Sequence, residues 1–114
     1  NKQSVNIKPV KLLESKPSAT RLGQNYPNPF NPETWIPYEL AEPCEVLIKI
    51  YNISGKLVRT LTLGMRDAGV YTTPNQAAYW DGRNVRGEKV ASGVYFYTLQ
   101  AGRFFDSKKL VILE

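Results

Sequence analysis

The sequence predicts an all-β fold, an antiparallel β-sandwich of about seven short strands. Apolar and polar residues alternate in short runs, and turns rich in glycine and proline separate these runs at intervals of about eight to twelve residues. No stretch combines helical periodicity with helix caps. With 114 residues, the chain is long enough for one domain with a sizeable core.

Residues 1–21 are predicted to be a linker or leader from a preceding domain, with room for one edge strand. This segment has five lysine or arginine residues and one acid, Glu14, so it holds +4 of the net charge of +5. The remainder has no basic stripe interleaved with aromatic residues, and we do not expect it to bind nucleic acid. No apolar run approaches the roughly 18 residues of a membrane helix. Because the chain does not begin with Met, we expect it to be part of a longer protein.

A proline loop, residues 25–34, organises the rest of the chain. Proline fixes φ and disfavours the helical region for the residue before it, so the loop is predicted to be stiff and extended. Tyr26 and Phe30 are expected to pack against the core as aromatic anchors. The loop is either a purely structural connection or a recognition surface for an extended peptide or a receptor. In the second case the contacting residues would be Asn25, Tyr26, Pro27, Asn28, Pro29, Phe30, Asn31 and Pro32.

The first predicted strands follow the proline loop. Residues 34–40 alternate with one buried face, and because Pro37 cannot donate to a ladder, this strand should lie at an edge or carry a bulge. Residues 44–51 have the strongest strand pattern. Turn residues follow at 52–55, and residues 56–63 return as the partner strand, which completes a hairpin.

The second half of the chain is predicted to contain shorter elements and a final hairpin. Residues 64–73 are expected to be irregular around a short strand at 70–72, and residues 77–80 form another short strand. Two tight glycine turns follow within residues 81–89. Residues 94–113 form the last hairpin, and their apolar end indicates a buried final strand.

The residues needed for catalysis are scarce. Histidine is absent and Cys44 is the single cysteine, so the usual general base, an internal disulfide and a cysteine metal site are all excluded. Cys44 is expected to be a small buried residue and Trp80 a core residue, whereas Trp35 is either a core-edge residue or a binding platform. Asp81 precedes a glycine and is expected to hold its own turn. We therefore expect no enzyme activity and no metal site.

Several motifs together resemble the type A C-terminal sorting domains of type IX secretion. In chain order they are residues 22–34 (LGQNYPNPFNPET), 50–52 (IYN), 55–58 (GKLV), 68–71 (AGVY), 80–84 (WDGRN), 90–97 (VASGVYFY) and 108–111 (KKLV). Residues 80–97 are also similar to the Ig-like domain of flagellar hook-capping proteins. We expect structural roles for Trp35, Tyr51, Gly55, Trp80, Asp81, Gly82, Gly93, Tyr95 and Tyr97.

The sorting-domain resemblance implies an Ig-like β-sandwich over residues 22–114, at the C-terminal end of a larger secreted bacterial protein. An outer-membrane translocon reads such a domain, and the cargo reaches the cell surface. The resemblance implies no catalysis and no cofactor. The implied recognition segments are the proline loop and the final strand around Lys108 and Lys109. The two lysines can instead serve only to prevent strand addition at a sheet edge.

Two alternatives stay open. Residues 34–37 carry Trp35 and Pro37 where the usual sorting domain has polar or small residues, and this variant looks like the terminal modules of large multidomain secreted proteins, some with dockerins. The domain can therefore be a structural module that packs on a neighbouring domain through residues 5–13 and the proline loop. It can also be a carbohydrate- or calcium-binding β-sandwich, for which we expect exposed, coplanar Trp35 and tyrosine rings or a melting temperature raised by calcium. The isolated domain is expected to be a monomer.

Overall fold

The structure, a computed structural model, describes residues 16–30 and 32–113. The predicted packing segment at residues 5–13, and Asn31 of the proline loop, lie outside the described residues. Within the described part the chain forms nine strands and no helix, which confirms the all-β prediction with a higher strand count. The strands are β1 (Arg21–Leu22), β2 (Thr34–Ile36), β3 (Tyr38–Leu40), β4 (Cys44–Asn52), β5 (Leu57–Arg66), β6 (Gly69–Tyr71), β7 (Ala78–Trp80), β8 (Gly93–Ala101) and β9 (Phe104–Ile112).

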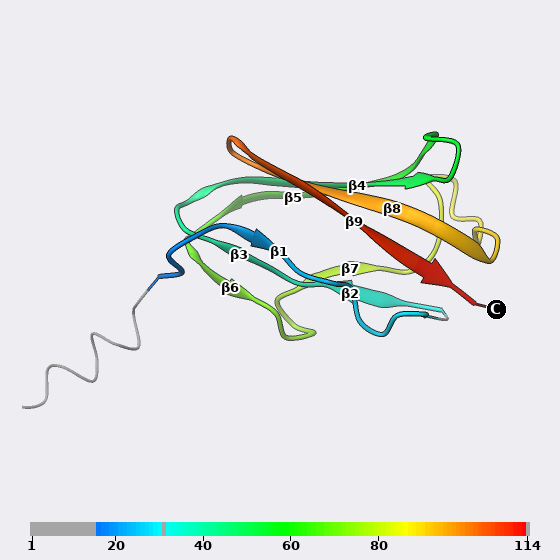
Figure 1. The fold of residues 1–114 in the computed structure, drawn as a ribbon, viewed down its shortest axis with the longest axis horizontal. Helices are drawn as coiled ribbons and strands as arrows, with labels where there is room; N and C mark the ends of the chain where they lie inside the picture. The colour runs from blue at the N-terminus through cyan, green and yellow to red at the C-terminus, as the bar shows by residue number, and fades with distance from the viewer. Residues whose placement is uncertain (1–15, 31, 114) are drawn as a thin grey trace, which may run out of the picture.

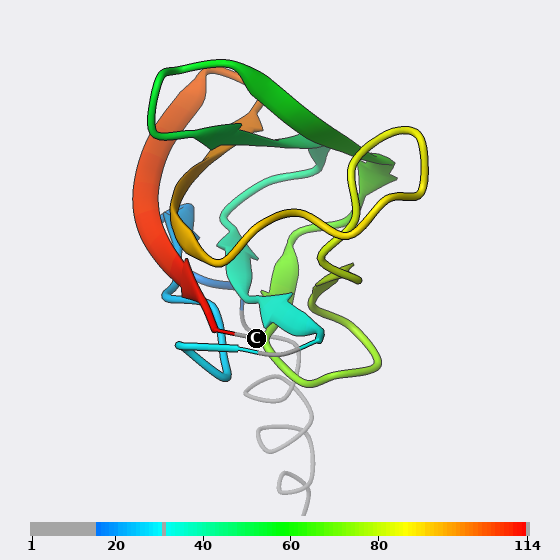
Figure 2. The same cartoon turned by 90° about the vertical axis from the view of Figure 1, so that its right-hand side faces the viewer.

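The strands form two facing layers (Figure 1). One layer is a four-stranded antiparallel sheet with the order β5-β4-β8-β9, so β5 and β9 are its edges. The other layer consists of a three-stranded sheet, β1-β3-β6, and the pair β2-β7. Seen from the end of the sandwich, the four long strands curve over the short ones (Figure 2). The fold is an Ig-like β-sandwich.

Alternating side chains from both layers fill the core. On β4, Val46, Ile48 and Ile50 are buried, as the pattern of residues 44–51 predicts. On the neighbouring strand β8, Leu99 and Tyr97 are buried opposite Ile48 and Ile50. Tyr95, farther along the same face of β8, is also buried. The facing layer contributes Ile36, Tyr38, Leu40 and Trp80, and the Trp80 side chain is fully buried, which confirms its predicted place in the core. Cys44 is half-buried at the core edge rather than fully buried.

Residues 34–40 do not form the single strand that their alternation predicts. The chain is divided at Pro37: β2 pairs with β7, whereas β3 pairs with β1 and β6. Proline has no N–H to donate, so the ladder cannot run through it, and the chain changes partner at that residue. The alternation itself is preserved across the break, because Thr34, Ile36, Tyr38 and Leu40 are all buried. The prediction of one continuous strand was therefore wrong, although its buried face was predicted correctly and β2 does lie at a sheet edge.

Gly64 does not end the second strand of the first hairpin, although residues 64–73 are predicted to be irregular. The β5 strand continues to Arg66, with Met65 and Arg66 paired with Glu45 and Cys44. The register shifts between Val46 and Leu47, and Gly64 takes a φ of +77° at this irregularity. Glycine adopts that conformation without steric cost, so it permits a β-bulge here rather than a strand end.

Candidate recognition surface

Asn25 is a buried polar residue that fixes the start of the proline loop. Its backbone N–H donates to the hydroxyl of Tyr97 at 2.9 Å, and the same hydroxyl donates to the carbonyl of Gly23 at 2.7 Å. The Asn25 Nδ2 group donates to Thr34 Oγ1 at 3.0 Å, which joins the two ends of the loop. Burial raises the pKa of the Tyr97 hydroxyl to about 12. Tyr97 is thus a core residue whose hydroxyl holds the loop in place.

Phe30 anchors the other end of the loop in the core, as predicted. Its side chain is 2% exposed, and its ring meets the ring of Trp80 edge-to-face with centroids 5.5 Å apart. Its backbone N–H donates to the carbonyl of Val111 at 3.0 Å, and its carbonyl accepts from the N–H of Leu113 at 3.1 Å. Phe30 therefore pairs in parallel with the end of β9 while its side chain fills the core.

Tyr26 does not reach the core, which corrects its predicted role as an anchor there. Its backbone exchanges hydrogen bonds of 2.9 and 2.8 Å with Trp35, and its ring stacks on the half-buried Trp35 ring at 6.2 Å. Trp35 and Tyr79 are direct partners in the β2-β7 pair, so the three rings form a row on the side away from the core. The alternation explains this placement, because the neighbours of Trp35, Thr34 and Ile36, point inward.

The aromatic row is not flat. The Tyr26 and Trp35 rings are inclined by 24°, but the Trp35 and Tyr79 rings are inclined by 53°. Such a tilt is typical of aromatic side chains that pack on one another. The hydroxyl of Tyr79 donates to Glu33 Oε1 at 2.6 Å, and this hydrogen bond raises the pKa of the tyrosine. The row therefore departs from the coplanar platform that the carbohydrate alternative requires.

The two predicted recognition segments lie against each other. The N–H of Val111 donates to Asn28 Oδ1 at 2.9 Å, and Gln24 Nε2 donates to the carbonyl of Lys109 at 2.8 Å. Together with the Phe30 contacts, these bonds close the outer edge of β9 over its last residues. In Figure 2 the end of β9, in red, descends beside the loop, in blue to cyan. We call this joint region the loop-edge surface: residues 24–30 and 32 together with 108–113.

The predicted recognition residues differ in their solvent exposure. Asn25 and Phe30 are buried and hold the surface from within, and Tyr26 and Lys108 are half-buried. The outward positions are those of the exposed residues, namely Pro27, Asn28, Pro29, Pro32 and Lys109. A partner that contacts this region meets a stiff, proline-rich surface with the Lys109 ammonium group beside it.

Gly82 packs closely against the backbone of the proline loop, a contact that the sequence analysis did not predict. Its φ is +76°, and a Cβ built on it would lie 2.8 Å from the carbonyl oxygen of Pro32. Asp81 holds the turn as predicted, since its Oδ1 accepts from the N–H of Arg83 at 3.0 Å. The same oxygen also forms an ion pair with Arg59 at 3.0 Å, which ties this turn to β5. The WDG triplet indicates a turn, but no local pattern shows that the proline loop lies on it.

The remaining predicted structural residues occupy turns and strand ends. Gly55 has a φ of +84° in the turn between β4 and β5, where Asn52 Oδ1 accepts from the N–H groups of Ser54 and Lys56. Gly93 begins β8, Tyr51 is half-buried near the end of β4, and the hydroxyl of the buried Tyr95 donates to the carbonyl of Ala91.

The described part of the chain contains no cluster of three or more His, Cys, Asp or Glu residues that could hold a metal ion. Burial raises the pKa of the Cys44 thiol, which disfavours the reactive thiolate. In residues 16–30 and 32–113, no helix has the length and apolarity needed to cross a membrane.

Residues 33–103 match the family model of the FlgD Ig-like domain. The chain belongs to this family. The resemblance first found in residues 80–97 is thereby confirmed, and it extends from β2 to β8. The FlgD match stops before β9 and leaves out nearly all of the proline loop. These two segments outside the match are the ones that bind each other in the structure.

Two solved structures from Porphyromonas gingivalis share the fold. Dimeric latent PorU from Porphyromonas gingivalis is 18% identical with a TM-score of 0.61, over 88% of this chain and 10% of PorU. PorZ, described as an essential bacterial surface component of the type-IX secretion system of the same organism, is 18% identical with a TM-score of 0.53, over 80% of this chain and 11% of PorZ. FlgD from P. aeruginosa is 23% identical with a TM-score of 0.49, over 64% of this chain and 54% of that one. The chain thus spans about a tenth of the length of PorU and PorZ. No curated protein sequence matches it.

Proposed function

We propose that this chain is a non-catalytic sorting module of a larger secreted bacterial protein, read by an outer-membrane secretion machinery and delivered to the cell surface. In this proposal residues 22–114 form the module and residues 1–21 connect it to the preceding domain. The observation that carries the proposal is the union of the proline loop with the end of β9. The two segments that the sorting-domain resemblance marks for recognition form one surface, joined through Asn28, Phe30 and Val111.

The loop-edge surface has the physical properties that a recognition signal needs. Internal hydrogen bonds from Asn25 and the buried Phe30 ring fix its backbone before any partner arrives, which lowers the entropy lost on binding. Pro27, Pro29 and Pro32 are exposed and lack N–H groups, so a partner need not satisfy backbone donors there. Lys109 adds one exposed positive charge. A receptor can therefore read shape and charge on a rigid surface.

Catalysis has no assigned role in this proposal. The sequence contains no histidine, and the single thiol of Cys44 is half-buried with a raised pKa. The fold of PorZ, a surface component of a type IX system, supports the proposed setting at the level of the shared fold.

Export of a reporter tests the proposal. The full 114-residue chain is fused to the C-terminus of a periplasmic reporter enzyme in a bacterium that has the type IX translocon. We expect the reporter at the cell surface or in the medium, and its retention in the periplasm in a strain without the translocon. Retention in both strains would favour the alternative of a module that packs only on a neighbouring domain.

Variants of the fusion locate the signal. Lys109→Glu reverses the charge on the loop-edge surface, and Arg103→Glu makes the same change at the exposed tip of the last hairpin. We expect only Lys109→Glu to reduce export, because only that residue lies on the proposed contact surface. A second fusion, of residues 22–114 alone, tests the module boundary and should be exported like the full chain.

A further inference from the structure

A second surface of the molecule has the features of a ligand site and shares no residue with the loop-edge surface. It is a hollow of about 330 Å³ between residues 52–58 and 84–90, which we call the end groove. Both segments lie at the same end of the sandwich (Figure 1). The volume is at the lower end of the range of about 300–1,000 Å³ that small ligand pockets occupy.

The end groove exposes apolar side chains that the fold does not use. Leu57 and Val85, which line it, are 48% and 84% exposed, and Ile53 at the tip of the adjoining turn is 77% exposed. Val58 and Val90 are half-buried and complete the apolar part of the lining, and the remaining lining residues are polar or charged apart from the Tyr95 ring. Apolar side chains gathered around a hollow, rather than scattered singly, indicate an interaction site.

The charge of the end groove is positive. Lys56 and Arg86 line it, and no lining residue is an acid. Across residues 52–58 and 84–90 there are three cations and one acid, Glu88, whose Oε1 already accepts from Asn84. Within the described part of the chain, neither the Lys56 nor the Arg86 side chain forms an ion pair with a carboxylate. Two cations beside an apolar hollow complement a ligand that combines apolar groups with negative charge.

Side-chain hydrogen bonds hold both walls of the end groove. Asn84 Oδ1 accepts from the N–H groups of Arg86 and Glu88 at 2.9 and 3.0 Å. Asn52 Oδ1 accepts from the N–H groups of Ser54 and Lys56 at 3.0 and 2.9 Å on the other wall. Such bonds fix turns locally, so Lys56 and Arg86 are presented from backbones that are already ordered.

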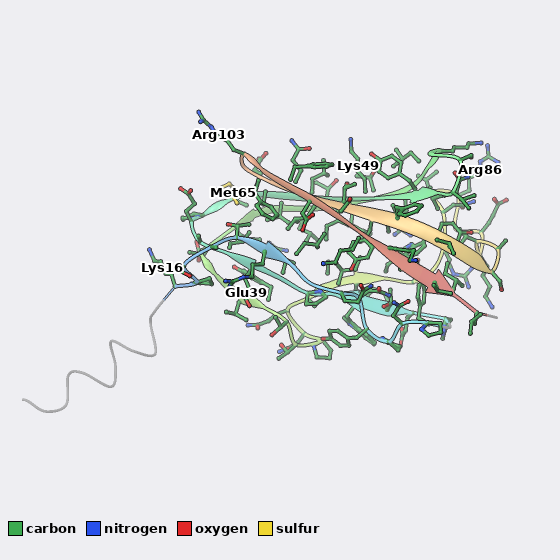
Figure 3. The ribbon with its side chains drawn as sticks, in the orientation of Figure 1. Lys16, Glu39, Lys49, Met65, Arg86 and Arg103 are labelled. Carbon is green, nitrogen blue, oxygen red and sulfur yellow. The ribbon has the colours of Figure 1, made fainter. Side chains whose placement is uncertain are left out.

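We propose that the end groove binds an extended acidic peptide segment. An apolar side chain of the peptide fills the hollow beside Leu57 and Val90, and flanking carboxylates pair with Lys56 and Arg86. The hollow favours a peptide over a lipid surface, because a bilayer contacts a convex or flat face and does not fill a pocket of this size. The site is independent of the proposed sorting function. It lies at the opposite end of the molecule from Lys16 and Arg103, as the labelled side chains show (Figure 3).

Fluorescence anisotropy with short labelled peptides tests this site. The first probe alternates aspartate and leucine, the second replaces aspartate with asparagine, and the third replaces leucine with serine. We expect the 114-residue protein to bind the first probe at least several-fold more tightly than the other two. Because exposed ion pairs are screened, its affinity should fall as the salt concentration rises.

Charge reversal at Lys56 and Arg86, the two cations that line the end groove, provides the decisive comparison. The double variant Lys56→Glu with Arg86→Glu should weaken binding of the first probe about tenfold, since two exposed ion pairs are replaced by repulsion. Arg103→Glu is the matched control at the far end and should leave the affinity unchanged. All three positions are exposed, so the fold should tolerate these changes, and far-ultraviolet circular dichroism verifies it.

Several results would overturn the proposal. These are no binding of the first probe, equal binding of the asparagine probe, or an equal loss of affinity in Arg103→Glu. Sedimentation with phosphatidylserine vesicles distinguishes the other class of anionic partner. If the double variant loses vesicle binding while the wild type ignores the first peptide, the end groove contacts membranes and the peptide assignment is wrong.

Discussion

Asn28 Oδ1 accepts a hydrogen bond from the backbone N–H of Val111 at 2.9 Å, although 83 residues separate the two in sequence. The carbonyl of the same Val111 accepts from the N–H of Phe30, so both polar groups of Val111 on the side away from β8 are paired with the proline loop. A strand at a sheet edge normally exposes such groups to other chains. The loop therefore occupies the place of a neighbouring strand at the end of β9.

Removal of the Asn28 amide should open this edge. In Asn28→Ala the N–H of Val111 loses its acceptor, and we expect a loss of unfolding free energy of about 1 kcal/mol. Amide hydrogen exchange followed by NMR should show faster exchange at Val111, with the amides between β4 and β8 unaffected. Gln100→Ala changes an exposed side chain on β8 and should leave Val111 protected. Unaltered exchange at Val111 in Asn28→Ala would mean that the asparagine does not close the edge.

Alanine substitutions at two glycines with similar φ angles can distinguish the cost of backbone strain from the cost of a steric clash. Gly82 and Gly87 have φ values of +76° and +84°, but only a Cβ at Gly82 meets a neighbour, the Pro32 carbonyl oxygen at 2.8 Å. Gly87→Ala should cost about 1 kcal/mol from the backbone conformation alone. Gly82→Ala carries that cost and must also displace the proline loop, so we expect roughly 3 kcal/mol in total.

Chemical denaturation of the two variants measures the difference. Equal losses of stability in Gly82→Ala and Gly87→Ala would show that the loop moves away from the turn without cost. A larger loss in Gly82→Ala confirms that the loop presses on this turn.

Local alternation was sufficient to predict most of the strands of this fold. Residues 44–51 and 94–113 alternate clearly, and they form β4, β8 and β9. Alternate side chains are buried along β4 and β8, whereas the expected buried final strand, β9, is an edge strand in which only Leu110 and Ile112 are buried. Where a strand began, ended or continued differently from the prediction, a glycine or proline was the cause. Pro37 divides a continuous pattern between two sheets, and Gly64 permits a bulge inside a strand. Periodicity reports which face is buried, but it carries no information about which strand lies alongside.

The candidate surface was predictable only in part, for a related reason. The proline content indicates a stiff loop, and an apolar aromatic such as Phe30 is a natural core anchor. The bonds from Gln24 and Asn28 to β9 join residues far apart in the chain, and single polar side chains leave no periodic signal. The end groove also depends on two loops that meet only in the folded structure.

Truncation of Phe30 tests how much the loop contributes to the core. Phe30→Ala removes a nearly fully buried ring that contacts Trp80 and leaves a cavity, so we expect a loss of about 3–5 kcal/mol in the free energy of unfolding. Phe105→Ala removes a ring of the same size that is 65% exposed on β9, and it should cost less than about 1 kcal/mol. Urea denaturation of both variants provides the comparison. Similar losses would contradict the role of Phe30 as the core anchor of the loop.

Alkaline pH should ionise the buried Tyr97 hydroxyl and remove the proton that it donates to the Gly23 carbonyl. Burial raises the pKa of Tyr97 to about 12, whereas a tyrosine in the unfolded chain titrates near its ordinary value of about 10. Because the unfolded chain loses this proton first, the contribution of Tyr97 to stability is complete below about pH 10 and decreases as the pH rises toward 12. A difference of this size corresponds to about 2–3 kcal/mol over that interval.

Tyr97→Phe isolates this contribution from those of the other tyrosines. At neutral pH the variant should be less stable by roughly 1–3 kcal/mol, because the N–H of Asn25 and the carbonyl of Gly23 lose a buried partner. Phenylalanine does not titrate, so the stability of the variant has no contribution of this kind. The wild type loses stability between pH 10 and 12 because its buried hydroxyl resists ionisation, and the difference in unfolding free energy between the two proteins should therefore narrow. Urea denaturation at intervals across this range measures the gap. A gap that stays constant up to pH 12 would show that Tyr97 ionises equally easily in the folded and unfolded chains, which contradicts the effect of burial on its pKa.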